Sequence, residues 1–367
     1  ITTLDFFHQI KRYQDPATGA DKSFMLGDIF HSDPVVLGNP DNFRYWTADV
    51  GGSGTLPLED PCATSPNGYR CYFDKQQLRR KMVILGSNSG QLHAFDAGIW
   101  RGFNGNGCEN STIPGQQILQ GDFDGGTGRE IFSYVPRISL ESQNDLRLLG
   151  DHDFTIDGRV SHGDVFIDPV HDGMPSVNDR EWRSVLIGGM REGGKGYFAI
   201  DYTQPDTLDV CNGRPVIPEP ETGARNWVPS CMDGGPGCGT VSFATPLWEF
   251  DDTNGCGIQL ADGSSDDDGN GLADLGDSWG APVIGRIQVL DDSGDIEELH
   301  VAIFGGGMDP DRKGLASAEG NHLYMLDIET GRVVYKRPVQ GSIAMEVAAV
   351  DTDQNGLLDT IYFGTTV

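Results

Sequence analysis

The sequence predicts an all-β protein, organised as a modified β-propeller with four-stranded blades, and three observations lead there. Short runs of β-branched and aromatic residues alternate with turns rich in Gly, Asp, Asn and Pro. Helical periodicity is nearly absent from the 367 residues. The strand-like runs also recur in a fixed order of four types, which is typical of propeller blades.

Three of the predicted blades contain one run of every type, in order, and a fourth contains only the first two types. Runs of the first type lie at 31–38, 160–167, 279–285 and 342–350, and runs of the second at 82–86, 184–189, 300–305 and 360–364. Runs of the third type, each ending in Asp, lie at 91–96, 197–201 and 323–327, and runs of the fourth at 130–135, 246–250 and 333–336. The glycines that end the second type are expected to allow a tight hairpin into the third.

These runs predict blades over about 26–136, 160–252 and 279–339, and a blade truncated after its second strand over 342–367. A closed propeller needs more blades. We therefore expect residues 1–367 to be a propeller fragment, with N-terminal and C-terminal parts of a longer, exported protein absent from it. Long insertions separate the strands, and loops on such scaffolds usually carry the binding chemistry. The insertions lie at 39–81, 101–129, 204–244 and 253–278.

Charge restricts the partners that are plausible. The chain carries 55 acidic and 26 basic residues, a formal net charge of −29. Such a surface repels phosphate backbones and disfavours nucleic-acid binding, while it attracts cations. Most of the charge is also explained by solubility alone. No apolar stretch reaches membrane length, so no membrane span is expected.

The seven cysteines favour an oxidising compartment. They contain no CxxC pair, which argues against a zinc ribbon or a haem attachment. Their concentration in loops predicts disulfides, with one cysteine left over, and the pairing is open. The cysteines are Cys62, Cys71, Cys108, Cys211, Cys231, Cys238 and Cys256.

A calcium loop is the strongest chemical signal. Asp351, Asp353, Asn355 and Asp359 put oxygen side chains at positions 1, 3, 5 and 9 of a tight loop, and the carbonyl of Leu357 supplies an oxygen at position 7. Ca²⁺ takes six to eight hard oxygen ligands, and oxygen-bearing side chains at alternate positions of a tight loop can all point toward one bound ion. Gly at position 6 permits the sharp turn, whereas Tyr at position 12 departs from a helical EF-hand. The alternative is a solvated turn without metal.

A second stretch has the same spacing, and we treat it as a weaker candidate for Ca²⁺. It lies within an acidic run inside an insertion, where such a pattern arises more easily by chance. Its ligands would be Asp266, Asp268, Asn270, Leu272 and Asp274. A third stretch, 122–126, lacks the later oxygens and is interpreted as a turn.

Catalytic signals are weak, which predicts that the chain is not an enzyme. It has no GxSxG nucleophile elbow, and residues 193–196 resemble a phosphate-binding loop only superficially. His31, His93 and His162 lie in or beside strand-like runs. Packing or hydrogen bonding is the commoner role for such histidines.

The ordered motifs resemble the PilY-type type IV pilus tip and biogenesis proteins. They include GDIFHSDPVV at 27–36, GSNSGQLHAFD at 86–96, EIFSYVP at 130–136, WRSVLIGG at 182–189 and GGKGYFAID at 193–201. LWEF at 247–250, LYMLDIETG at 323–331 and VDTD at 350–353 continue the series, so the likeness runs through most of the chain. One departure is Thr365, where that family usually has Asp after a Tyr-Phe-Gly run.

This resemblance implies a C-terminal propeller, with Ca²⁺ at the loop of Asp351, carried extracellularly at the pilus tip or the outer surface of a bacterial cell. It implies roles in pilus biogenesis, in opposing retraction, in twitching motility and in surface adhesion. The partners implied are minor pilins of the tip complex and a host or abiotic surface.

Two alternatives stay open at this point. The first is a structural scaffold that caps the pilus without adhesive contacts. The second is a quinone-dependent dehydrogenase, because quinoprotein-like propellers share the third strand run followed by Thr-Gly. Those enzymes usually carry adjacent cysteines in the cofactor pocket, and this sequence has none.

Overall fold

The computed structural model describes most of the strand-bearing sequence. The described residues are 27–52, 61–102, 121–140, 153–168, 177–204, 244–251, 274–290, 293–309 and 319–367, with the short segments 12–14, 18–19, 21–23, 108–109, 118–119, 258–259, 265–266 and residue 311.

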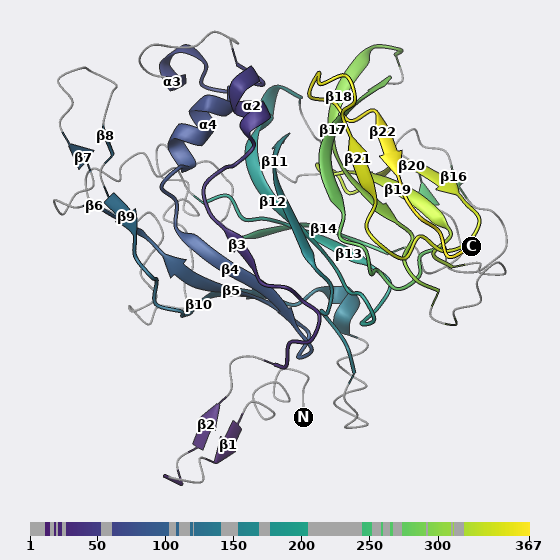
Figure 1. The fold of residues 1–367 in the computed structure, drawn as a ribbon, viewed down its shortest axis with the longest axis horizontal. Coiled ribbons are helices and arrows are strands. Elements are labelled where there is room, and N and C mark those ends of the chain that lie inside the picture. Colours follow the sequence, from purple (N-terminus) through teal and green to yellow (C-terminus); the bar gives the residue numbers. More distant parts are fainter. Residues whose placement is uncertain are drawn as a thin grey trace.

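Within these residues, three four-stranded antiparallel sheets and a two-stranded one follow each other along the chain (Figure 1). The first contains β3 (Val35–Leu37), β4 (Lys81–Ser87), β5 (Gln91–Gly98) and β10 (Glu130–Tyr134). The second contains β11 (Val160–Ile167), β12 (Glu181–Gly189), β13 (Tyr197–Asp201) and β14 (Thr245–Phe250). The third contains β17 (Val283–Leu290), β18 (Ile296–Gly305), β19 (His322–Asp327) and β20 (Val333–Pro338), and β21 (Ala348–Val350) pairs with β22 (Thr360–Tyr362).

In every four-stranded sheet, strands consecutive in this order are hydrogen-bonded neighbours. This is the order that the four run types predict, so the all-β, propeller-like fold class is confirmed. Consecutive connection by hairpins is also the simplest way to build an antiparallel sheet, because each strand pairs with one already in place.

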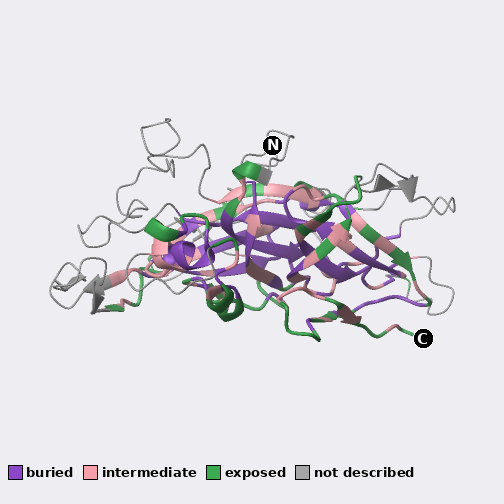
Figure 2. Cartoon of the chain, turned by 90° about the horizontal axis from the view of Figure 1, so that it is seen from above, coloured by how far each residue is buried: buried purple, intermediate pink, exposed green. Residues whose placement is uncertain are grey.

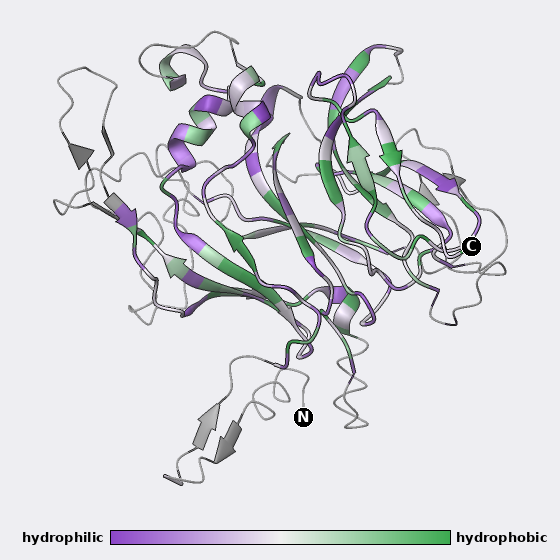
Figure 3. Cartoon of the chain, in the orientation of Figure 1, coloured by the Kyte–Doolittle hydropathy of each residue, from purple (hydrophilic) through white to green (hydrophobic). Residues whose placement is uncertain are grey.

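The sheets pack face to face, and clusters of buried apolar side chains lie between them. Figure 3 shows hydrophobic residues along the strands of these sheets. One cluster joins the first and second sheets through residues such as Ile84 and Leu186, and another joins the second and third through Val185 and Phe304. Every residue of β13 is buried, since this inner strand of the sheet has a neighbouring sheet on both faces. Figure 2 shows this burial running through the strands at the centre of the molecule.

Glycines at the ends of the second strands have a different role from the expected one. A Cβ added to Gly86 would lie 2.3 Å from the carbonyl oxygen of Ile156, and one on Gly305 would lie 2.5 Å from that of Ile343. In both cases the crossing backbone leads into the next sheet. The β4–β5 hairpin instead has its positive φ at Gly90, at 80°. The hairpin explanation was therefore wrong for Gly86, because the glycine makes room for a crossing chain.

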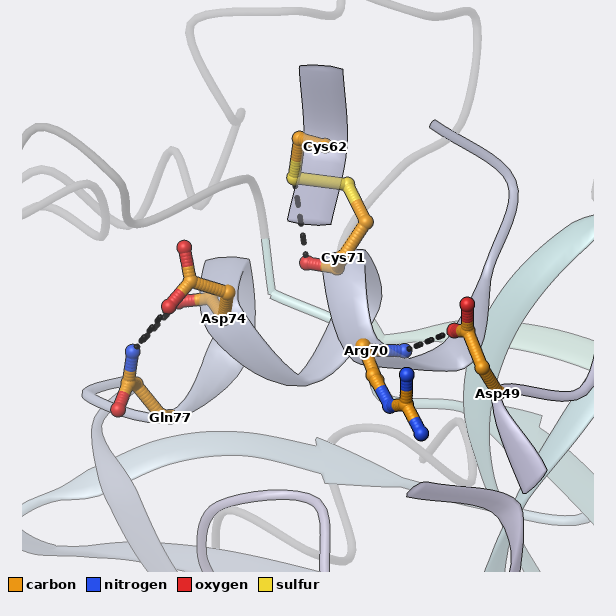
Figure 4. Close-up of a disulfide and its surroundings, with 6 residues drawn as sticks. All are labelled: Asp49, Cys62, Arg70, Cys71, Asp74 and Gln77. Carbon is orange, nitrogen blue, oxygen red and sulfur yellow. Dashed lines mark hydrogen bonds between the residues drawn. A yellow bond between two sulfur atoms is a disulfide. The ribbon is translucent and has the colours of Figure 1, made fainter. Parts of the chain in front are cut away.

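The insertion between β3 and β4 is helical, contrary to the expectation that helices are nearly absent. It contains α2 (Phe43–Ala48), α3 (Pro61–Thr64) and α4 (Tyr69–Gln76). Helices of four to eight residues complete at most about two turns, so they show little periodicity in sequence. A disulfide between Cys62 and Cys71 joins α3 to α4 (Figure 4).

This disulfide confirms the prediction that the cysteines form such bonds, for one pair. Cys108 lies in β7 (Cys108–Glu109), and the cysteines at 211, 231, 238 and 256 lie outside the described residues. Closing a loop of this length stabilises a fold by roughly 2–3 kcal/mol in the chain-entropy account.

The helical insertion is fastened to the second sheet through tyrosines. The Tyr69 hydroxyl donates to Asp164 Oδ2 at 2.6 Å, and the Tyr72 hydroxyl lies 2.5 Å from Ser184 Oγ. Tyr45 of α2 packs its ring against Trp182 of β12, with 5.3 Å between the ring centroids. Burial of large aromatic rings dominates the stability of such contacts.

Short elements complete the described structure. β1 (Arg12–Gln14) pairs with β2 (Asp21–Ser23), β6 (Trp100–Gly102) with β9 (Gly121–Phe123), β7 with β8 (Ile118–Leu119), and β15 (Ile258–Gln259) with β16 (Ser265–Asp266); 3₁₀ turns occupy Arg137–Ser139 and Val177–Asp179. Among the described helices, none combines the length and the apolar character needed to cross a bilayer.

Candidate metal centre

The strongest predicted calcium loop connects β21 to β22, and its acidic side chains converge. Asp351, Asp353 and Asp359 each offer a carboxylate oxygen, and these three oxygens lie within 4.8 Å of one another. Asp351 is buried, whereas Asp353 and Asp359 are exposed. The sequence pattern thus corresponds to a cluster in space, open to solvent on one side.

Backbone amides hold the carboxylate of Asp351 in place. Its Oδ2 accepts the N–H of Gly356 at 2.8 Å, and its Oδ1 accepts the N–H of Asn355 at 3.1 Å. The N–H of Asn355 also lies 3.1 Å from Asp353 Oδ1. Side chains of this kind mimic backbone turns, which is why Asp and Asn are common in tight loops.

Two residues of the loop have left-handed backbone conformations. Gln354 has φ of 64° and Gly356 has φ of 90°. The second value is natural for Gly, which has no Cβ to clash. A Cβ at Gly356 would also lie 3.1 Å from Arg286 Nη2. The glycine at position 6 therefore permits the turn, as predicted, and also the close approach of β17.

The end of the loop is tied to two strands. Asp359 donates its N–H to the Val350 carbonyl at 3.1 Å, and Leu358 donates its N–H to the Arg286 carbonyl at 2.7 Å. Asp359 Oδ2 accepts the hydroxyl of Thr352 at 2.7 Å. These bonds help to hold the last carboxylate of the pattern close to the first.

Local hydrogen bonds favour the ionised state of two of the carboxylates. Burial alone would raise the pKa of Asp351, but the amide of Gly356 and the guanidinium of Arg44 outweigh it and lower the pKa. The pKa of Asp359 is lowered first by the hydroxyl of Thr352 and then by that of Thr360. Both groups are therefore ready to bind a cation at neutral pH.

This set of donors fits a hard divalent cation. Carboxylate, amide and carbonyl oxygens are what Ca²⁺ prefers, and the loop contains no sulfur or imidazole. Asp351, Asp353, Asn355, Leu357 and Asp359 are the residues that would hold it. Asn355 Oδ1 currently accepts the N–H of Leu357 at 2.8 Å, so it lies within the turn and faces its own backbone.

The weaker calcium loop falls mostly outside the described residues. This applies to Asp268, Asn270 and Leu272, while Asp266 lies in β16. Asp274 is described and buried, and its Oδ2 accepts Lys336 Nζ at 2.6 Å. This second site stays a prediction, with its last carboxylate paired to a lysine.

The histidines and the Asp/Gly turn weighed in the sequence have structural contacts. His31 Nδ1 lies 2.5 Å from Asp157 Oδ2, and His93 Nδ1 lies 2.6 Å from Glu130 Oε1. His162 is half-buried on β11. In the 122–126 stretch, Asp124 Oδ1 accepts the N–H of Gly126 at 3.0 Å, which is a turn.

One residue at the loop escapes any motif. Arg44, on α2, donates from Nη1 to Asp351 Oδ2 at 2.5 Å. These two residues are 307 positions apart, and only the fold brings them together. No local spacing in the sequence signals such a contact.

Comparisons with known proteins agree with the motif series. A type IV pilus biogenesis factor, a PilY1 homologue of Xylella fastidiosa, is 28% identical over 188 residues, which cover 51% of this chain and 11% of that protein. A further match to a PilY1 homologue of the same organism is 26% identical over 359 residues and covers 88% of this chain and 20% of that protein. PilY1 of Pseudomonas aeruginosa is 25% identical over 222 residues, with 59% and 15% covered.

These relatives confirm the resemblance to PilY-type proteins, although the chain spans only 11% to 20% of their length. No family model matches the chain. The crystal structure of the Pseudomonas aeruginosa PilY1 C-terminal domain aligns with a TM-score of 0.45 at 20% identity, covering 90% of this chain and 43% of that one.

Proposed function

From the similarity to PilY1 proteins, we propose that this chain is a calcium-binding propeller region of a type IV pilus-associated protein. It acts extracellularly, at the pilus tip or the outer cell surface, with minor pilins as partners. Its roles are to support pilus biogenesis, oppose retraction, and contribute to twitching motility and to adhesion on a host or abiotic surface. The names of the curated relatives support the pilus association.

The observation that carries the calcium assignment is the convergence of three carboxylates within 4.8 Å. Like charges this close repel each other, and bound Ca²⁺ offsets that repulsion. An ordered loop also stabilises β17 and β21, because Leu358 and Asp359 are hydrogen-bonded to these strands. Calcium in the millimolar range outside cells suits the weak affinity of extracellular calcium modules.

A non-enzymatic role is part of the proposal. The relatives are named as biogenesis factors. His31 and His93 are paired with carboxylates, as structural histidines commonly are. A visible chromophore in the purified protein would instead indicate the quinone-dependent alternative.

The calcium assignment is tested by thermal unfolding of wild type, Asp351→Asn and Asp359→Asn, each with calcium and with a chelator. At about 100 times Kd, calcium should stabilise the wild type by about 2.7 kcal/mol. Both substitutions remove a carboxylate but keep its shape, so this increment should disappear. Asp124→Asn is the matched control, because it changes a carboxylate in a similar turn. An equal calcium increment in all variants would refute the site.

The cellular roles are tested with the same substitutions in the full-length protein. Cells carrying them should be compared for surface pili, twitching and attachment. Normal pilus number with reduced attachment favours adhesion, whereas loss of pili favours the scaffold alternative.

A further inference from the structure

We propose that Arg44 sets the calcium affinity of the 351–359 loop by competing with the ion for Asp351. The inference rests on the proposed calcium site and adds to it a residue from another part of the chain. Arg44 belongs to α2, in the insertion of the first sheet, whereas the loop joins the two strands of the last.

The contact places a fixed positive charge on a carboxylate of the predicted ligand set. Arg44 Nη1 lies 2.5 Å from Asp351 Oδ2, and the Asp351 side chain is only 3% exposed. Among the residues that the structure describes, no other basic side chain forms an ion pair with Asp351, Asp353 or Asp359. The guanidinium therefore supplies part of the neutralisation that a bound cation would otherwise supply.

The two cations exclude each other for electrostatic reasons. A divalent ion held by Asp351 would lie next to the guanidinium, and like charges at short range repel. The Arg44 side chain is 58% exposed, so it is free to turn into solvent when the ion binds. Affinity for calcium is then reduced by the free energy of the ion pair that must be given up.

The helix itself does not depend on this ion pair. Asn42 caps α2, with Oδ1 accepting the N–H of Tyr45 at 3.1 Å, and the ring of Tyr45 packs against Tyr69 and Trp182. Arg286 lies over the ring of Tyr45, with 5.6 Å to the centroid. A substitution at Arg44 should therefore leave α2 in place and change only the charge at the loop.

Calcium affinity of Arg44→Gln is the direct test, by isothermal titration calorimetry of chelator-treated protein. Glutamine keeps a long polar side chain and removes the charge, so Kd should fall by about twofold to fivefold, as expected when an ion pair at the protein surface no longer has to be broken. Arg332→Gln is the matched control. It removes one charge from an exposed arginine in the β19–β20 turn and should change Kd by less than about twofold.

A second measurement separates competition from a purely structural ion pair. In chelator, Arg44→Gln should melt below the wild type, because Asp351 has lost its partner. In saturating calcium the difference should disappear, because the calcium-bound wild type has already given up the ion pair and the variant has none to lose. A structural ion pair alone lowers the melting temperature in both conditions.

Three results distinguish a failure of the Arg44 inference from a failure of the calcium site itself. Wild-type binding with an unchanged or higher Kd in Arg44→Gln would overturn this inference and leave the calcium site intact. Lower melting temperatures of the variant in both conditions would do the same. Absence of binding heat in both wild type and variant would overturn the calcium site together with the inference.

Discussion

His300, on β18, is a buried histidine whose surroundings oppose its positive charge. Burial first, and then the charges of Arg286 and Arg180, lower its pKa to about 3. Its Nδ1 accepts the N–H of Phe166 at 3.3 Å, and its ring meets that of Trp182 edge-on at 5.7 Å. The folded protein thus holds a neutral imidazole on β18, beside the aromatic rings of Tyr45 and Trp182.

The pH dependence of stability follows from this. Between pH 6.5, the ordinary pKa of histidine, and about 3, the unfolded chain binds a proton at His300 that the folded chain does not, so stability falls as pH falls. The contribution is up to about 1.4 kcal/mol per pH unit. His300→Asn keeps a hydrogen-bond acceptor but removes the titrating group. The increase of the free energy of unfolding with pH should therefore become smaller by that amount, as measured by urea unfolding in chelator between pH 7 and 4.5.

The same substitution at the half-buried His162 is the control for general effects of losing a histidine. Equal slopes in wild type and His300→Asn would show that the folded protein protonates His300 normally.

Sequence spacing was sufficient to predict that the three carboxylates of the loop converge, but not what surrounds them. Positions 351, 353 and 359 are close in sequence, and a tight turn brings such residues together whatever the rest of the fold does. Arg44 and Arg286 reach the loop from other sheets or insertions. Contacts of that kind depend on how sheets pack, and a single sequence does not record that packing.

At the scale of the strand, Gly86 and Gly364 allow a direct comparison, because another segment of backbone crosses only the first of them. A Cβ there would lie 2.3 Å from the Ile156 carbonyl oxygen, a backbone atom that cannot turn aside. Gly364 follows β22, the corresponding second strand, and no described atom lies within 4 Å of its Cβ position. Gly86→Ala should lower the free energy of unfolding by about 1–3 kcal/mol, as overpacking does.

Gly364→Ala is the matched variant, and it should be neutral or slightly stabilising, because Ala has less backbone freedom to lose. Chemical denaturation of the two variants beside wild type checks both values. Equal effects would mean that the backbone at Gly86 relaxes without cost.

Strands were more predictable than helices in this chain. The four run types gave the sheet order because alternating and fully apolar runs are long enough to recognise. The helices of the first insertion are held mainly by tertiary contacts, such as those of Tyr69 and Tyr72 with β11 and β12. Their local sequence carries little helical signal, and packing decides their conformation.

For the whole molecule, the net charge of −29 predicts a strong response to salt. Self-repulsion of a charged surface destabilises the compact state, and salt screens it. In chelator, the melting temperature should rise as sodium chloride increases from about 0.01 M to 0.3 M, because the Debye length falls from about 30 Å to below 10 Å.

Calcium should add a further increment at constant ionic strength, and magnesium at equal concentration should not reproduce it, because Mg²⁺ demands a smaller, more rigid octahedron. A melting temperature that falls with sodium chloride would show that favourable ion pairs, such as that of Arg180 with Glu329, outweigh the repulsion.

The close approach at the second-strand glycines also has a use for aligning distant relatives. Different apolar residue types can fill the space between two sheets, so the sequences of the strands diverge readily between relatives. Only glycine fits where another backbone passes 2.3 Å from the Cβ position, as at Gly86, or 2.5 Å, as at Gly305. Such a glycine therefore marks the junction between repeat units after the strands have lost their likeness, and it provides a fixed point from which to count them across long insertions.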